Sequence, residues 1–248
     1  MKKILGKYKY LGGESTSDLV VGKVYTRVEH ENEFRIIDDS EEDYLYLPEN
    51  FQLILSDNIE IVKENITEMQ VDAIICASNN ALMRGSGLCG AIFKKAGFEL
   101  DKECASIGNC NTGDAVITKG YNLKAKHIIH TVAPKWYMVK PEEEKRKQFR
   151  NCYKNIFNIA IKNDIKTIAI PCIGTGIYQC PIEIGRDFAF EEANKVADKF
   201  EKIYFVCFRD EEYAIYKQMW YNGNENKKLR SELVYGKFRK NRKNIFKK

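Results

Sequence analysis

The stretch Val71-Asp72-Ala73-Ile74-Ile75-Cys76, followed by Ala77-Ser78-Asn79, carries the pattern that decides the fold of this 248-residue chain. A short, almost uninterrupted apolar run is typical of a strand buried on both faces of a parallel sheet. Similar runs occur at 59–62, 127–130, 167–170 and 202–207, and stretches with helical spacing occur at 91–104, 145–163, 184–200 and 211–220. Short apolar strands that alternate with helices predict an α/β layered domain with a largely parallel sheet.

Ligands of such sheets usually bind at the carboxyl ends of the strands, so we expect chemistry in the loops after Cys76 and Ile170. The first loop contains Gly85-Ser86-Gly87-Leu88-Cys89-Gly90 and leads into a predicted helix; the second is Pro171-Cys172-Ile173-Gly174-Thr175-Gly176-Ile177-Tyr178. Glycine backbone and helix N-terminal amides approach anions closely. Two such loops at neighbouring strand ends predict a diphosphate site, although either loop alone fits a tight structural turn.

The first loop also matches Gly-x-Gly-x-x-Gly, the pattern of dinucleotide-binding turns. In that pattern the first glycine follows the strand directly, and an acidic residue about 20 positions later ends the next strand. Here eight residues separate Cys76 from Gly85, and Glu103 falls in a predicted helix. The spacing therefore disfavours a dehydrogenase.

Ordered motifs between Ile59 and Trp220 resemble the macrodomain family, specifically its MacroD-like branch of ADP-ribose-binding domains. Besides the two loops and the strand quoted above, they are Asn65-Ile66-Thr67, Cys110-x-Thr112-Gly113-Asp114-Ala115, Gly120-Tyr121-Asn122-Leu123 and His130-Thr131-Val132-x-Pro134. The resemblance implies a three-layer α/β/α sandwich over a mixed sheet at 53–222. It also implies ADP-ribose or an ADP-ribosylated protein as partner, with no cofactor and no metal.

The resemblance also assigns binding roles. Asn65 and the Ile66 amide would contact adenine, with Asn65 standing where the family has an Asp, so that the contact lacks charge assistance. Phe208 would stack on adenine or, equally well, belong to the core. The remaining implied contacts, with the strand end, the diphosphate and the distal ribose, are Ala77, Asn79, Gly87, Leu88, Cys89, Gly90, Ile173, Gly174, Thr175, Gly176, Ile177 and Tyr178.

The catalytic residues implied by the resemblance are Asn79, which would orient the distal ribose, and the residue before Gly90. That residue is an Asp in the family and is Cys89 here. A thiol binds water poorly; it could serve as a nucleophile if the helix N-terminus lowered its pKa, or simply pack as a small residue. A hydrolase that releases mono-ADP-ribose from proteins or cleaves O-acetyl-ADP-ribose, and a non-catalytic ADP-ribose reader, both remain open.

The two ends of the chain differ from its centre. Residues 1–52 hold seven Lys and Arg against eleven Asp and Glu, and short runs at 18–30, 34–37 and 44–47 predict strands. Residues 1–52 resemble a small SH3-like β-barrel, or else they form a β-extension of the main domain. Val24, Thr26 and Val28 should share one face of their strand. A tail at 223–248 is basic, with Phe238 and Phe246 among its cations, and predicts weak nucleic-acid contact.

The cysteine pattern and the hydropathy of the chain indicate the cellular compartment. The polar Lys7-Tyr8-Lys9-Tyr10 interrupts the N-terminus before a signal peptide could form, and no run of about 18 apolar residues exists. Eight cysteines without a Cys-x-x-Cys pair predict reduced thiols and a cytoplasmic protein without membrane contact.

Overall fold

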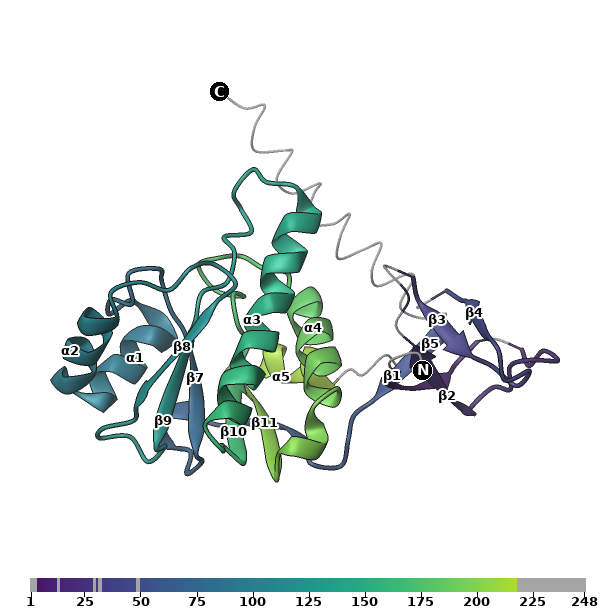
Figure 1. Cartoon of the computed structure of the whole chain (residues 1–248), viewed down its shortest axis with the longest axis horizontal. Helices are drawn as coiled ribbons and strands as arrows, with labels where there is room; N and C mark the ends of the chain where they lie inside the picture. The colour runs from purple at the N-terminus through teal and green to yellow at the C-terminus, as the bar shows by residue number, and fades with distance from the viewer. Residues whose placement is uncertain (1–3, 13, 29, 31–32, 48–49, 218–248) are drawn as a thin grey trace. The chain divides into compact units, whose positions relative to one another are not determined.

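The computed structural model describes residues 4–12, 14–28, 30, 33–47 and 50–217, and Figure 1 traces them. These residues form two compact units that divide between Ile54 and Leu55. Each unit has its own sheet. The predicted basic tail lies outside the described residues.

The larger unit is built on a six-stranded mixed sheet. Its order is β6 (Ile59–Lys63), β11 (Lys202–Cys207), β10 (Thr167–Pro171), β7 (Ala73–Ala77), β9 (His127–Thr131) and β8 (Ala115–Lys119). The first five strands pair in parallel, and β8 runs antiparallel to β9. The carboxyl ends of β7 and β10 therefore meet at the same edge of the sheet.

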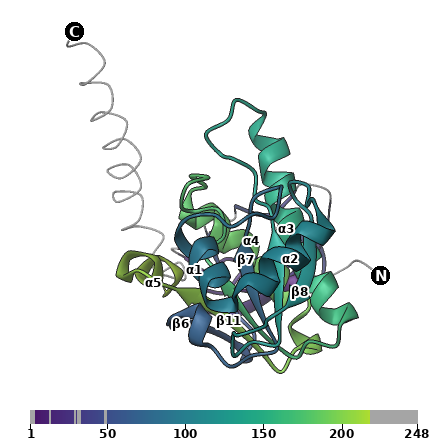
Figure 2. The ribbon, with the colours of Figure 1, turned by 90° about the vertical axis from the view of Figure 1, so that its left-hand side faces the viewer.

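Helices cover both faces of this sheet (Figures 1 and 2). One face carries α1 (Gly87–Ala96) and α2 (Phe98–Ile107), which face the viewer in Figure 2. The other carries α3 (Glu142–Lys162) and α4 (Ile182–Asn194), with α5 (Asp210–Lys217) packed on α4 through the Phe190 and Tyr216 rings. Two 3-10 turns complete the unit, η2 (Ile66–Glu68) and η3 (Ala197–Lys199).

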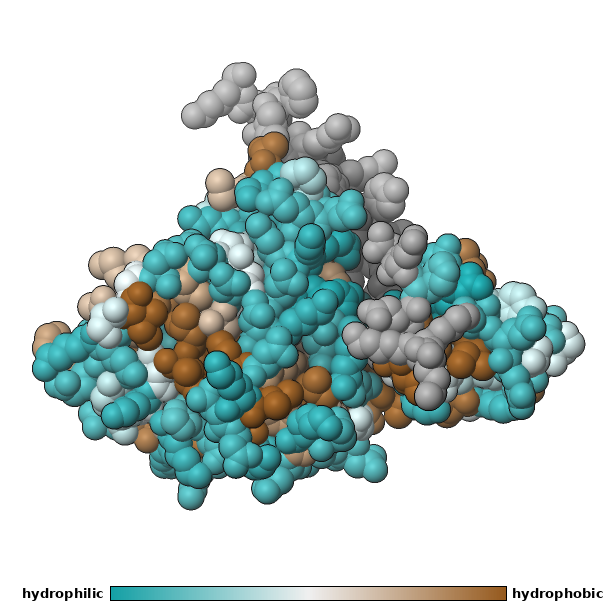
Figure 3. All heavy atoms as spheres, in the orientation of Figure 1, coloured by the Kyte–Doolittle hydropathy of each residue, from teal (hydrophilic) through white to brown (hydrophobic). Residues whose placement is uncertain are grey.

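The two faces of the sheet have cores of different chemistry. Aliphatic and cysteine side chains fill the side of α1 and α2, among them Ile74, Cys76 and Cys89. Aromatic rings fill the side of α3, where Phe149 contacts Tyr153 and other rings. The outer surface of α3 is hydrophilic (Figure 3), so this long helix is amphipathic as its spacing predicts.

Two helix predictions and one omission need correction. The predicted helix at 91–104 is two helices, because Gly97 has φ +94° and separates α1 from α2. The predicted helix at 184–200 ends at Asn194 and continues only as η3. The omission is β8, which lies within the family motif at 110–123 and is absent from the predicted strands.

The smaller unit is an antiparallel sheet with an aromatic core. Its strand order is β4 (Asp43–Leu45), β3 (Arg35–Ile37), β2 (Val24–Val28), β1 (Ile4–Tyr10) and β5 (Phe51–Ile54). The two strands that the sequence did not predict are β1 and β5. The core contains Tyr8, Tyr10, Leu19, Tyr25, Phe34, Ile36 and Phe51.

The predicted shared face of β2 is wrong. Val24 is 46% exposed, whereas Tyr25 and Val28, which have opposite parity, are both buried. The pairing of β1 with β2 is irregular between Ile4 and Gly6, and such a bulge increases local twist. A twisted strand can turn side chains of either parity toward a small core.

Asp72 joins the start of β7 to the start of β10. Its carboxylate accepts hydrogen bonds from the backbone N–H groups of Lys166 and Thr167 at 3.1 and 2.9 Å, and from the Lys126 ammonium at 2.7 Å. Burial alone would raise the pKa of this carboxyl, but these donors outweigh it and hold the pKa well below its usual range. Asp72 therefore fixes the sheet at the edge opposite the two glycine loops.

Replacing Asp72 by Asn should lower the free energy of unfolding at pH 7 by about 1 to 3 kcal/mol, because backbone donors lose a charged acceptor. The depressed folded-state pKa means that the stabilisation is complete above the unfolded pKa of roughly 3.9 and is lost as pH falls below it. Urea titrations of the variant and the wild type at pH 7 and at pH 3 measure both effects.

Asp198→Asn serves as the control, because Asp198 is 67% exposed and pairs with Lys199 on the surface. We expect it to change stability by less than about 0.5 kcal/mol. An Asp72→Asn variant as stable as this control at pH 7 would contradict the assigned role.

Candidate functional site

The two glycine loops lie next to each other because their strands are neighbours. Loop 1 (78–86) follows β7, loop 2 (172–181) follows β10, and these strands pair in parallel through Ala73 and Ile168. Ala77 is the last residue of β7 and is partly exposed at this edge. The prediction that both loops meet at one sheet edge is confirmed.

Loop 1 ends in a backbone suited to an anion. Gly87, the first residue of α1, has φ +59°, and a Cβ there would meet no atom within 4 Å. Ser86 makes no side-chain cap hydrogen bond, and the first turn of α1 contains no acidic residue. A Cβ on Gly90 would lie 2.5 Å from the Gly85 carbonyl oxygen, so the first turn packs tightly against the loop. Leu88, in the same turn of α1, is half-buried.

Loop 2 is closed by its own hydrogen bonds. The Thr175 hydroxyl donates to the Cys172 carbonyl at 3.0 Å, and the Cys180 N–H donates to the Gly174 carbonyl at 2.9 Å. Ile173 is fully buried beneath the loop, whereas Ile177 is 68% exposed. No atom lies within 4 Å of a Cβ built on Gly176, so both loops have open space above a glycine.

Tyr178 extends loop 2 toward the first loop. Its carbonyl accepts a hydrogen bond from the Trp136 N–H at 2.7 Å, and its ring packs on the core beneath α1. Burial raises the pKa of its phenol, and the Cys89 sulfur contributes to that shift.

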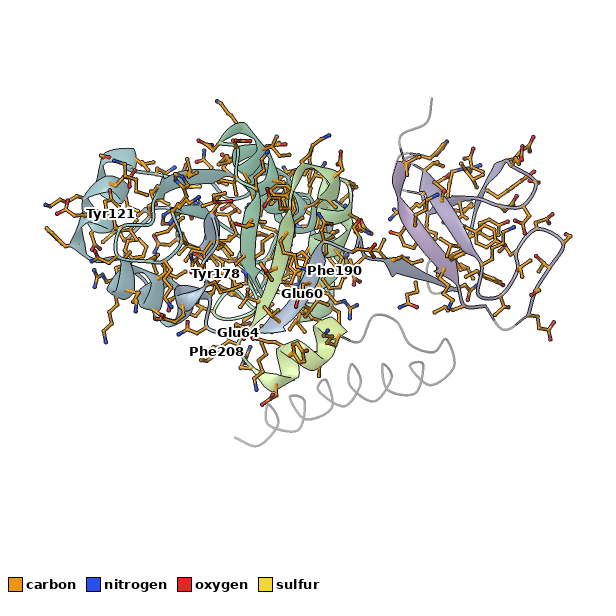
Figure 4. All side chains as sticks on the ribbon, turned by 90° about the horizontal axis from the view of Figure 1, so that it is seen from below. Glu60, Glu64, Tyr121, Tyr178, Phe190 and Phe208 are labelled. Atoms are coloured by element: carbon orange, nitrogen blue, oxygen red, sulfur yellow. The ribbon has the colours of Figure 1, made fainter. Side chains whose placement is uncertain are left out.

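Asn65 and Phe208 follow the ends of the neighbouring strands β6 and β11. The Glu64 N–H donates to the Cys207 carbonyl at 3.3 Å, and Figure 4 shows Phe208 beside Glu64. Phe208 is 76% exposed, which removes the alternative that it belongs to the core. The Asn65 side-chain oxygen accepts from the N–H and hydroxyl of Thr67 at 3.1 and 2.9 Å, and so caps η2. Ile66 is buried within that turn.

Asn79 forms a closed ring with loop 1. Its side-chain Nδ2 donates to the Met83 carbonyl at 2.8 Å, and its Oδ1 accepts from the Met83 N–H at 3.1 Å. The carboxamide therefore stabilises the turn that leads to Gly85. A ribose at this position would have to share or replace these two hydrogen bonds.

Cys89 lies in the first turn of α1 and is 7% exposed. The neighbouring Cys76 thiol does most to hold the pKa of Cys89 below its ordinary value. Burial opposes that shift, while the Gly85 amide and the Ser78 hydroxyl support it. A helix N-terminus favours a thiolate in the same way. Cys89 is thus an activated sulfur, although it has no oxygen with which to orient water.

A series of buried polar side chains connects Cys76 to Thr118. The Ser78 hydroxyl lies 3.3 Å from the Cys76 sulfur and 3.0 Å from His130 Nδ1, and His130 Nε2 lies 2.9 Å from the Thr118 hydroxyl. Burial lowers the pKa of His130 to about 4, so its imidazole is neutral at pH 7. Sequence analysis missed the Cys76, Ser78 and His130 cluster, because periodicity indicates which residues are buried but not which of them touch.

Other features of the described residues lie apart from the loops. A cavity of about 320 Å³ is lined by residues 109–111, 114–116, 155, 158 and 159. Its polar groups satisfy one another, since Asn155 donates to the Gly113 carbonyl and Asn111 to Asp114. In the described part of the chain, no three His, Cys, Asp or Glu side chains form a metal-binding group. None of its helices combines the length and apolar character that crossing a membrane requires.

The fold is that of an α/β protein with two glycine loops at one edge of its sheet, and comparison with known proteins identifies the family. A family model described as "Macro domain" matches residues 75–189. A macro domain-containing protein of Chlorobaculum tepidum is 40% identical over 169 residues, which cover 66% of this chain and 97% of that protein. This chain therefore belongs to the macrodomain family.

Two further relatives carry names that mention a ligand or an activity. The ADP-ribose glycohydrolase MACROD2 of Xenopus laevis is 38% identical over 178 residues, which cover 69% of this chain and 42% of that longer protein. The Trypanosoma brucei macrodomain, solved in complex with ADP-ribose, is 32% identical with a TM-score of 0.60 and covers 65% of this chain and 68% of that one.

Proposed function

We propose that this chain binds ADP-ribose along the carboxyl edge of its large sheet. The observation that carries the proposal is the pair of loops with open space above Gly87 and Gly176, at the ends of neighbouring parallel strands. The diphosphate would lie between them and accept hydrogen bonds from loop amides and the first turn of α1. The exposed ring of Phe208 would stack on adenine.

The hydrogen bond that the sequence predicted between Asn65 and adenine is weakened by contacts that Asn65 already makes. Its side-chain oxygen already accepts two hydrogen bonds within η2. An amide oxygen has two lone pairs, so an adenine amino group would compete with Thr67. Adenine recognition would then depend mainly on Phe208 and the Ile66 backbone amide.

The reaction that fits this site is hydrolysis of the ester between C1″ of the distal ribose and an Asp or Glu side chain of a mono-ADP-ribosylated protein, or removal of the acetyl group from O-acetyl-ADP-ribose. In the protein ester, water would attack while the diphosphate accepts its proton, and the acceptor oxygen would leave with the bonding electrons. Asn79 and Tyr178 would lie beside the distal ribose, beyond the diphosphate. Without a carboxylate at position 89, the water is poorly oriented, and we expect a slow enzyme, since such groups contribute on the order of 100-fold or more.

A non-catalytic reader of ADP-ribose is the second candidate. One observation favours it: position 89 carries a thiol where a carboxylate would orient the water. Release of ADP-ribose from an automodified transferase separates the two candidates, because a reader retains the modified protein without releasing product.

Gly87→Glu should weaken ADP-ribose binding by about 100-fold or more, because a carboxylate would enter the space of the diphosphate and like charges cost several kcal/mol when juxtaposed. Isothermal calorimetry on the full chain measures the loss. Gly108→Glu is the matched control: Gly108 also has positive φ and open space above it, but it follows α2 and belongs to neither loop. Equal loss in both variants would contradict the assigned site.

Cys89→Asp should raise the hydrolysis rate by at least about 10-fold, since a carboxylate can orient water where the thiol cannot. Cys89→Ser is the control of similar size without charge, and it should show no such gain. A rate that is unchanged in Cys89→Asp, in a variant that still binds ADP-ribose, would remove the missing carboxylate as the reason for slow turnover.

The two ends of the chain would supply accessory contacts. For residues 4–54 an SH3-like barrel is supported by the strand order, a four-strand meander with the fifth strand beside the first.

The eight unpaired cysteines fit a reducing compartment such as the cytoplasm. The basic tail would contact nucleic acid, with cations on phosphates and Phe238 or Phe246 on bases.

The tail proposal predicts that the full chain binds a single-stranded oligonucleotide with an affinity that falls steeply with salt. Deleting residues 226–248 should abolish that binding. A variant in which the tail's Lys and Arg become Gln keeps the length and should behave like the deletion. Binding that survives both changes would remove the tail as the contact.

A further inference from the structure

The loop between β9 and α3, residues 132–141, presents apolar side chains to solvent at its tip. Tyr137 is 54% exposed, Met138 is 47% exposed and Val139 is fully exposed. Figure 1 shows this loop projecting beyond the start of α3. Apolar residues that are scattered singly over a surface are ordinary, whereas a contiguous exposed group is typical of an interaction site. The three residues 137–139, called the apolar tip below, are such a group.

The base of this loop is fixed on α3. The Trp136 ring meets the Phe149 ring edge-on, with the two ring centroids 6.3 Å apart. The Lys145 ammonium donates a hydrogen bond to the Trp136 carbonyl at 3.1 Å and lies 5.2 Å from the centre of the Trp136 ring. Because the base is held in place, a partner that binds the apolar tip would lose less free energy in ordering the loop.

The same base joins the loop to loop 2. The Trp136 N–H donates to the Tyr178 carbonyl at 2.7 Å, and the Lys135 ammonium lies 5.9 Å from the centre of the Tyr178 ring. Tyr137 directly follows the donor residue, and Ile177, which is 68% exposed, directly precedes the acceptor residue. Exposed apolar side chains from two loops therefore flank one backbone hydrogen bond.

The position of this hydrogen bond indicates what the apolar tip contacts. In the proposed function, on which this inference rests, Tyr178 would lie beside the distal ribose, and a modified protein is attached to that ribose at C1″. The attached polypeptide must leave the site at this end, whereas free ADP-ribose ends there. Apolar side chains on the polypeptide would gain most from contact with the tip. The exposed ammonium of Lys135 favours an acidic side chain beside them.

We propose that the apolar tip and Ile177 form a docking surface for the polypeptide of an ADP-ribosylated protein. The segment that fits carries apolar side chains within a few residues of the modified Asp or Glu, and an acidic side chain within reach of Lys135. This surface binds the modified protein more tightly than free ADP-ribose. It also selects among modified proteins, because their ADP-ribose groups are identical and only the polypeptides differ.

Two synthetic peptides of equal length, each carrying ADP-ribose through a linkage that cannot be hydrolysed, test the proposal. One peptide has Leu, Val and Asp around the modified position, and the other has Gly and Ser there. Isothermal calorimetry on the full chain measures both peptides and free ADP-ribose. We expect the apolar peptide to bind about 10-fold more tightly than free ADP-ribose, the gain expected from burying about one apolar side chain. The Gly and Ser peptide should bind like free ADP-ribose.

Variants assign the gain to the apolar tip. Tyr137→Ser, Met138→Ser and Val139→Ser together should remove the gain for the apolar peptide and leave the affinity for free ADP-ribose unchanged. Phe98→Ser is the matched control, because Phe98 is 68% exposed but begins α2 and belongs to neither loop. The control should keep the full gain. A gain that survives the triple change, or that the control also loses, would overturn the docking surface.

The same titrations separate this inference from the proposed function. If free ADP-ribose binds and the apolar peptide binds no more tightly, the docking surface is wrong and the proposed function stands. If neither free ADP-ribose nor a peptide binds the wild type, the proposed function is wrong and the docking surface with it. A triple variant that also loses free ADP-ribose would place the tip in the nucleotide site and overturn its role in contacting polypeptide.

Discussion

The parallel pairing of β7 with β10 is the constraint on which the rest of the site depends. It joins two strands that lie almost a hundred residues apart in the sequence and brings the loops that follow them to one edge. Asp72 reinforces the pairing from the opposite edge, where its carboxylate binds the amides of Lys166 and Thr167. Without this pairing, the two glycine loops would not lie close enough together to contact one diphosphate from its two sides.

The site needs no cationic side chain to attract an anion. The sequence assigns its excess of Lys and Arg to the tail, and the loops offer backbone amides, the uncapped first turn of α1 and open space above two glycines. This arrangement favours a diphosphate by geometry, since amides at fixed positions select shape as well as charge. The exposed ring of Phe208, at the ends of β6 and β11, extends the same edge toward a base.

Periodicity and glycine spacing predicted five of the six strands of the large sheet, all but β8, and the position of both loops. They could not predict the break at Gly97, whose positive φ splits one apparent helix, or the buried face of β2, which depends on twist. They also could not predict that Asn79 would bind Met83 or that the Ser78 hydroxyl would contact Cys76 and His130. Those contacts depend on how α1 and loop 1 settle on β7, which is a tertiary property that local patterns do not encode.

Position 89 is where this chain departs from the carboxylate that its resemblance to MacroD-like domains implies. The neighbouring Cys76 thiol and, to a lesser extent, the Gly85 amide lower the pKa of Cys89, but a thiol offers no carboxylate oxygen at this position. The most direct test of the account is a crystal structure of the full chain with ADP-ribose. We predict both phosphates between the first turn of α1 and loop 2, with adenine against Phe208. Density for ADP-ribose at any other surface, with these loops unoccupied, would contradict it.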